Sequence, residues 1–141
     1  MKRKRLWLFV IIVLVVLSIV FKDKLIQTYV KVFHEDLEVF SENLLDNSAL
    51  RSTTYGLWDV DIYQEDNMVE FMTGGFGLAP SSTYKGFYYS ADNTHKVFSV
   101  ADASIAPLVI DGDRATWTDG TDNHGMSIRI MDNWFWFEAS F

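Results

Sequence analysis

The sequence contains no cysteine among its 141 residues. Disulfides are therefore excluded, although small exported domains often depend on them. Lipoprotein anchoring is excluded as well, because that modification acylates a cysteine. The domain must hold together by packing, and sixteen aromatic residues lie between Tyr55 and Phe141. Each can bury roughly 150 to 250 Å², so we expect a core rich in aromatic side chains.

Basic residues are scarce beyond the N-terminus. From Leu25 onward six basic residues stand against eighteen acidic ones, a net charge of −12. A surface this negative repels phosphate backbones, so nucleic acid is excluded as a partner. A cation, a basic peptide or a neutral glycan remains open as a ligand.

Signatures of catalysis are also missing. The three histidines, His34, His95 and His124, do not have the paired spacing of a zinc site. No Gly-x-Ser-x-Gly turn is present to expose a nucleophile. The glycine-rich residues 74–77 are not followed by Lys-Ser or Lys-Thr, so they are not a phosphate-binding loop. We therefore predict a protein that is not an enzyme and needs no cofactor.

The chain begins with a long apolar run. Residues 1–5 form a basic cytoplasmic segment, and residues 6–21, beginning at Leu6 and ending at Phe21, carry no charge. At about 1.5 Å per residue these sixteen residues reach roughly 24 Å. The hydrocarbon core is ~30 Å thick, and flanking basic side chains can close the gap by snorkelling. We predict that residues 6–21 are a single-pass transmembrane anchor in the lipid bilayer.

The flanking charges predict the orientation of this anchor. Four basic residues precede the run, whereas Lys22 and Lys24 follow it with Asp23 between them. The N-terminus is then cytoplasmic and the C-terminal domain extracytoplasmic, at the cell membrane. A cleaved secretory signal is the alternative interpretation. We favour retention, because the small residues that cleavage needs do not follow the run.

Residues 22–50 predict an amphipathic juxtamembrane helix that continues the anchor. Its apolar residues, from Ile26 to Leu44, recur at spacings of four and three, with charged residues between them. This stripe can pack on the domain or pair with a second copy as a coiled coil. Fewer than three heptads are present, so we favour packing on the domain over self-association. Residues 52–56 are predicted to be a linker.

Residues 57–141 predict a small antiparallel β domain, because apolar and polar residues now alternate with a period of two. We expect loops at residues 74–82 and 118–125. Trp134 to Phe137 are apolar without interruption, which indicates a strand covered on both faces. Seven or eight short strands are expected, at residues 58–63, 68–73, 84–90, 95–100, 108–110, 114–118, 126–131 and 134–140.

Four carboxylates form a candidate cation site in and near the polar loop: Asp111, Asp113, Asp119 and Asp122. Loops rich in oxygen ligands can hold Ca²⁺, but the spacing does not fit an EF-hand. The alternative interpretation is that these residues form turns, since Asp-Gly and Asp-Asn pairs cap their own backbone.

Four other residues are candidates for a ligand or partner surface: Tyr84, Tyr88, Trp117 and His124. Aromatic side chains stack on sugars or anchor peptides, but they also fill cores. His124 with Asp119 and Asp122 supplies part of the set that nucleophilic catalysis requires. This set is the basis for a small envelope enzyme as a second alternative.

Residues 73–90, residues 118–125 and the ending at residues 134–141 resemble a group of small membrane-anchored bacterial proteins with no assigned activity. The resemblance runs from about Trp58 to the end and implies an exported domain without disulfides. It transfers no site residues. The layout also resembles that of type IV pilins and pseudopilins, but the chain lacks their glycine before the apolar run and their glutamate within it.

The sequence therefore predicts an α+β fold, with an anchor helix, an amphipathic helix and a small antiparallel sheet. The predicted function is a non-catalytic accessory or binding module of the cell envelope. A pseudopilin-like or coiled-coil assembly component is the first alternative.

Overall fold

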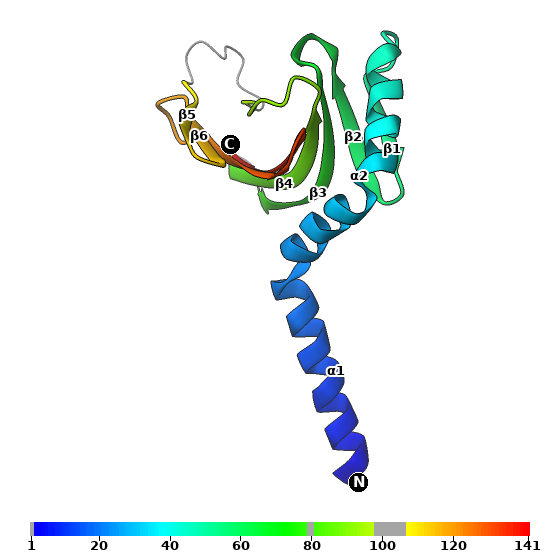
Figure 1. Cartoon of the computed structure of the whole chain (residues 1–141). Coiled ribbons are helices and arrows are strands. Elements are labelled where there is room, and N and C mark those ends of the chain that lie inside the picture. The colour runs from blue at the N-terminus through cyan, green and yellow to red at the C-terminus, as the bar shows by residue number, and fades with distance from the viewer. Residues whose placement is uncertain (1, 79–80, 98–106) are drawn as a thin grey trace.

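The computed structural model describes residues 2–78, 81–97 and 107–141. Within them the chain forms two helices followed by one open antiparallel sheet of eight strands (Figure 1). The predicted α+β class and the antiparallel sheet are confirmed.

Helix α1 (Lys2–Val20) projects away from the sheet, as Figure 1 shows. Its described side chains, at positions 7, 10–17 and 20, are all exposed. Among the described residues, no helix is both long enough and apolar enough to cross a membrane. The transmembrane span predicted at residues 6–21 is not supported by this finding.

Helix α2 (Lys22–Asp46) packs on the sheet. Phe21 lies between the two helices, so the predicted continuity is interrupted there. The predicted stripe is mostly confirmed, since Ile26, Val30 and Leu37 are buried against the sheet. Phe33 has non-helical backbone angles (φ −110°, ψ 18°) and its side chain is exposed. The kink there changes the direction of the helix, which takes Phe33 out of the stripe.

The eight strands form one sheet in the order β1-β2-β3-β4-β8-β7-β6-β5. The last strand in the sequence is therefore central, between β4 and β7, as its uninterrupted apolar residues predict. The strands are β1 (Ser52–Tyr55), β2 (Trp58–Tyr63), β3 (Met68–Leu78), β4 (Ser81–Ser90), β5 (Val109–Asp111), β6 (Arg114–Thr118), β7 (His124–Met131) and β8 (Trp134–Ser140).

Three of the predicted linkers, loops and strands are wrong. The predicted linker contains β1, whose threonines suit an edge strand despite their polarity. Most of the predicted loop at residues 74–82 is strand: residues 74–78 belong to β3, which passes a bulge between Met72 and Gly74 and stays paired with β4, and residues 81–82 begin β4. Residues 79–80 lie outside the described residues. The strand predicted at residues 95–100 is absent over residues 95–97, where Lys96 instead donates its backbone N–H to the Tyr88 hydroxyl. Residues 98–100 lie outside the described residues.

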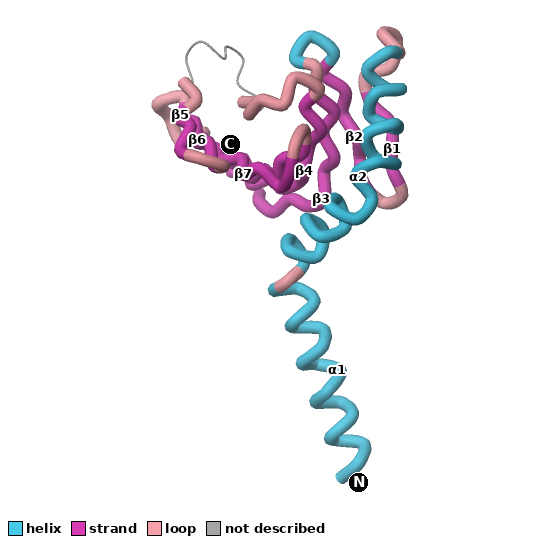
Figure 2. Tube along the Cα trace, in the orientation of Figure 1, coloured by secondary structure: helices cyan, strands magenta, loops and turns pink. Residues whose placement is uncertain are grey.

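The sheet curls, and α2 lies on its outer side (Figure 2). The side facing α2, which we call the α2 face, packs Phe71, Phe87 and Trp134 against the helix. The other side, which we call the concave face, buries a second group that includes Phe135 and Phe137. Strand β8 thus contributes to both faces.

Gly86 on β4 marks the tightest point of this packing. A Cβ atom at this position would lie 2.1 Å from the carbonyl oxygen of Phe71 and 2.8 Å from the ring of Phe137. Only glycine allows the strands and the ring to approach this closely.

Candidate functional site

The polar loop between β6 and β7 is held by hydrogen bonds to Asp119. One carboxylate oxygen accepts hydrogen bonds from the backbone N–H of Thr121, at 2.9 Å, and from its hydroxyl, at 2.6 Å. The other accepts one from the side-chain amide of Asn123, at 2.7 Å. These bonds, the Thr121 hydroxyl first, lower the pKa of Asp119. The carboxylate caps its own turn.

The other acidic candidates do not gather around Asp119. Asp111 and Asp122 are exposed, and Asp113 lies 3.9 Å from Arg129. Within residues 2–78, 81–97 and 107–141, no group of three His, Cys, Asp or Glu side chains is placed to hold a metal ion.

The proposed catalytic set of Asp119, Asp122 and His124 has no shared geometry. Nδ1 of His124 lies 2.8 Å from the backbone carbonyl oxygen of Asp122, so the ring contacts the main chain and not the carboxylate. The Asp119 carboxylate is bonded within its turn. A base held by a carboxylate beside a nucleophile, which this chemistry requires, is not assembled by these three residues.

The predicted ligand surface is wrong for two of its four residues. Tyr88 is 0% exposed and Trp117 4% exposed, and both belong to the concave face. Aromatic residues that alternate along a strand point into the core as readily as outward, and here the curl of the sheet encloses them. Tyr84 and His124 are exposed. They remain candidates for a partner surface.

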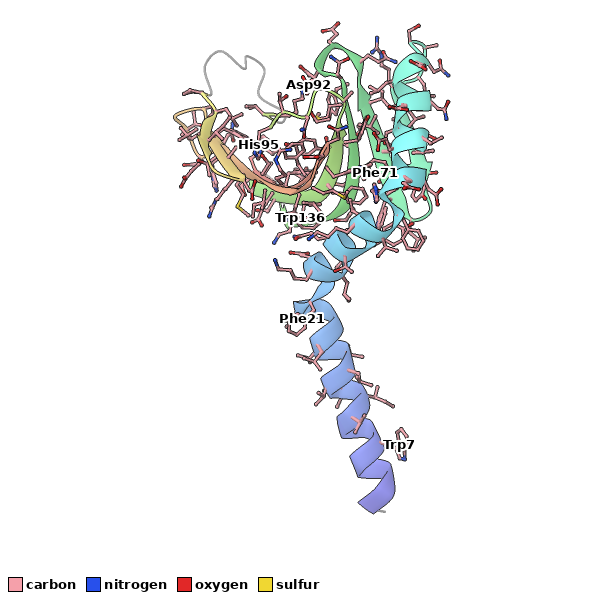
Figure 3. All side chains as sticks on the ribbon, viewed as in Figure 1. Trp7, Phe21, Phe71, Asp92, His95 and Trp136 are labelled. Carbon is pink, nitrogen blue, oxygen red and sulfur yellow. The ribbon has the colours of Figure 1, made fainter. Side chains whose placement is uncertain are left out.

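A buried polar pair on the concave face has no counterpart in the sequence analysis. Nδ1 of His95 lies 2.6 Å from the hydroxyl of Ser127, and both side chains are buried. Figure 3 places His95 within the curl of the sheet. Burial lowers the pKa of His95 and raises the pKa of the neighbouring Tyr88 to about 12. The pair lies 32 residues apart in the sequence, so no spacing motif could reveal it.

This pair has the wrong arrangement for a hydrolase. A catalytic serine contacts Nε2 of the histidine, and a carboxylate holds Nδ1. Here the Ser127 hydroxyl contacts Nδ1 of His95, and Nε2 of His95 has no hydrogen-bond partner in the described part of the chain. The geometry fits a polar contact that ties residues 91–97 to β7.

Glu70 is another buried ionisable group on the concave face. It is 5% exposed and lies opposite Asp61 and Tyr88 in the strand register. Burial, followed by the charge of Asp61, raises the pKa of Glu70 to about 7. The same burial raises the pKa of Tyr63, which shares a hydrogen bond with Glu70. This carboxyl titrates near neutral pH.

An apolar groove lies where α2 begins, near the end of the projecting helix. We call it the foot of the domain. Its volume is about 480 Å³, and the hairpin that joins β1 to β2 forms one wall while the first turns of α2 form the other. The foot is lined by Lys22, Leu25, Ile26, Tyr29, Tyr55, Gly56, Leu57 and Trp58.

Aromatic contacts hold the two walls of the foot together. The rings of Tyr29 and Trp58 meet edge to face, with centroids 5.4 Å apart. A side-chain hydrogen bond to Tyr55 raises the pKa of Tyr29. Leu57, at the tip of the hairpin, is fully exposed. No sequence pattern indicates this groove, because Leu57 and Trp58 are predicted to begin a strand.

Comparison of this chain with protein-family models, with curated proteins and with solved structures found no match.

Proposed function

We propose that this chain is a membrane-anchored protein whose β domain is a non-catalytic accessory or binding module outside the cell membrane. The observation that carries the proposal is α1, a helix whose described side chains are exposed although most of them are apolar. Figure 3 shows Trp7 and Phe21 on this projecting segment.

An apolar surface of this extent must be shielded from water by another apolar surface. A central Leu, Ile, Val or Phe contributes perhaps −0.5 kcal/mol to membrane insertion, so the run gains several kcal/mol in total. The domain does not need α1 for its core, because α2 and the sheet supply both buried groups of side chains. We therefore infer that lipid surrounds α1.

The orientation follows from charge. Four basic residues occupy positions 2–5, whereas two, Lys22 and Lys24, closely follow the apolar run. Positive segments stay in the cytoplasm, so the domain is placed on the opposite side. The exposed residues Tyr84 and His124 would then be available to an envelope partner.

A coiled-coil assembly through α2 is less well supported. The residues of its stripe, including Val30 and Leu37, are already covered by the sheet. A second copy could reach them only after α2 had left the domain, which would expose the aromatic core.

Protease added to intact cells tests the proposal. We expect the domain to be digested and the protein to stay in the membrane fraction after carbonate extraction. A domain protected from external protease, or a protein released by carbonate, would overturn the proposal.

A matched pair of variants shows whether α1 is the cause. Val16 on α1 and Val39 on α2 are both exposed, at 52% and 60%. A lysine at the centre of a membrane helix costs about 2.5 to 3.5 kcal/mol of insertion. We expect Val16→Lys to weaken membrane retention and Val39→Lys to leave it unchanged.

A further inference from the structure

The apolar run is shorter than a bilayer. Its sixteen residues reach roughly 24 Å, which leaves about 6 Å of the hydrocarbon core unfilled. At the N-terminal end the basic side chains of residues 2–5 can snorkel to the head groups, but they add no apolar length. Further apolar surface is available only at the end where α1 meets the domain.

Charges at this junction are engaged by the domain. Lys22 donates a hydrogen bond from Nζ to the carbonyl oxygen of Thr73, at 2.8 Å. The carboxylate of Asp23 lies 3.6 Å from Nζ of Lys85 on β4. Both side chains therefore reach toward the sheet and not away from it.

Apolar side chains are also exposed in the same turns. Phe21 and Leu25 are 51% and 59% exposed. Lys22 and Lys24 are exposed as well, and the long stem of Lys24 can carry its ammonium group to the level of the lipid head groups. The start of α2 thus presents an apolar side that continues the surface of α1.

The foot extends this apolar side to the β1–β2 hairpin. Gly56 adopts a left-handed conformation (φ +61°), which forms a two-residue turn with Leu57 at its tip. Turn positions usually carry polar residues, but here a leucine is fully exposed and adds nothing to the core. Tyr29, Tyr55 and Trp58 line the groove behind it. Tyrosine and tryptophan are the residues that gather at membrane interfaces.

We infer that the foot is seated in the outer leaflet and completes the short anchor, with a phospholipid acyl chain in the groove. The inference rests on the proposed membrane anchoring through α1. The groove has the volume of an ordinary small-molecule site. The domain then has a fixed orientation on the membrane.

The absence of cysteine permits a direct test. Leu57→Cys and Ile110→Cys each place one thiol at an exposed apolar position, the second on β5, away from α1 in Figure 1. Each full-length variant is labelled with an environment-sensitive fluorophore and reconstituted in vesicles of phosphatidylcholine and phosphatidylglycerol. Part of the lipid carries a nitroxide on its acyl chain, and vesicle flotation reports whether α1 is inserted.

We expect both variants to float and the probe at position 57 to be quenched at least about twofold more strongly than the probe at 110, since interfacial elements lie 5–10 Å into the head-group boundary. Equal quenching in floating vesicles would overturn the seated foot and leave the anchor standing. A probe at 57 that is shielded from aqueous iodide but not quenched by lipid would indicate a second copy in the groove, and would also overturn it. Failure to float would overturn both proposals.

Discussion

The two faces of the sheet bury different kinds of side chain. On the α2 face, Phe71 and Phe87 stack with ring centroids 4.6 Å apart beneath an apolar stripe of the helix. The concave face also buries aromatic rings, but it encloses a carboxyl group, Glu70, and an imidazole, His95. Burial of apolar groups stabilises a fold at any pH, whereas burial of ionisable groups makes the stability depend on pH. The same sheet therefore joins an apolar face to a face that titrates.

The largest expected effect comes from removing the strand that both faces share. Trp134 and Trp136 serve the α2 face, while Phe135 and Phe137 serve the concave face. A chain that ends at Asn133 loses the central strand, so we expect it to show no cooperative thermal transition. Removal of residues 1–21 should retain the transition, because α1 lies outside both groups of buried side chains. Circular dichroism melts of the two truncations separate these outcomes.

The apolar face can be probed alone through Leu37, which is fully buried on α2. Leu37→Ala should lower the free energy of unfolding by about 2 to 5 kcal/mol, because it removes buried methyl groups and leaves a cavity. The loss should be the same at pH 5 and pH 8. Val39→Ala, at an exposed position on the same helix, serves as the control in urea denaturation. A loss below about 1 kcal/mol for Leu37→Ala would mean that α2 does not seal this face.

The concave face should respond to pH through Glu70. Its carboxyl has a pKa of about 7 when folded, against an ordinary value of 4.5 in an unfolded chain. Between these values the folded protein binds more protons than the unfolded chain, so stability falls as pH rises through this window and is constant above it. The fall is of the order of 3 kcal/mol. Glu70→Gln should remove it and should stabilise the protein at pH 8, as measured by urea denaturation from pH 5 to pH 8.

His95, on the same face, should make the stability depend on pH in the opposite direction. Burial lowers its folded pKa from the ordinary value of 6.5, so the unfolded chain takes up a proton first as pH falls below that value. The stability of the Glu70→Gln variant should then decrease on acidification. Glu65→Gln, at an exposed position, should keep the pH profile of the unmodified protein. An unchanged profile in Glu70→Gln would show that this carboxyl is not buried as described.

The smallest effect is expected at the polar loop, which lies beyond both faces. Asp119→Ala removes the acceptor for Thr121 and Asn123 and should lower the melting temperature slightly. Asp122→Ala should have less effect, because its side chain is exposed. Addition of Ca²⁺ should leave both melting temperatures unchanged if the loop is a capped turn. A calcium-dependent rise that is lost in Asp119→Ala would instead establish a cation site.

The periodicity of apolar residues predicted the elements that are determined by residues close together in the sequence. The spacing from Ile26 to Leu44 identified the helix and its buried side, and the apolar run at Trp134 identified the central strand. The strand at residues 52–55 was not predicted, because backbone pairing at a sheet edge does not require apolar side chains. The glycines of β3 suggested a loop because glycine is a common turn former, whereas here a bulge keeps them paired.

The candidate site was less predictable, because its contacts join distant segments. His95 meets Ser127 only after the sheet has curled, and the burial of Glu70 depends on the enclosing concave face. Exposure could not be read from residue type either, since Tyr84 is exposed and Tyr88, four residues later, is buried. The foot depends on the pairing of a hairpin with the start of α2, which no local pattern encodes.

Gly86 has a consequence for the evolution of this fold. The carbonyl of Phe71 and the ring of Phe137 leave no room for even a methyl group beside it. Most surface positions can diverge without cost, but this one is confined to a single residue type as long as the two aromatic neighbours stay in place. Distant relatives with this strand packing should therefore keep a glycine at the position of Gly86, even where little else in the sequence is retained.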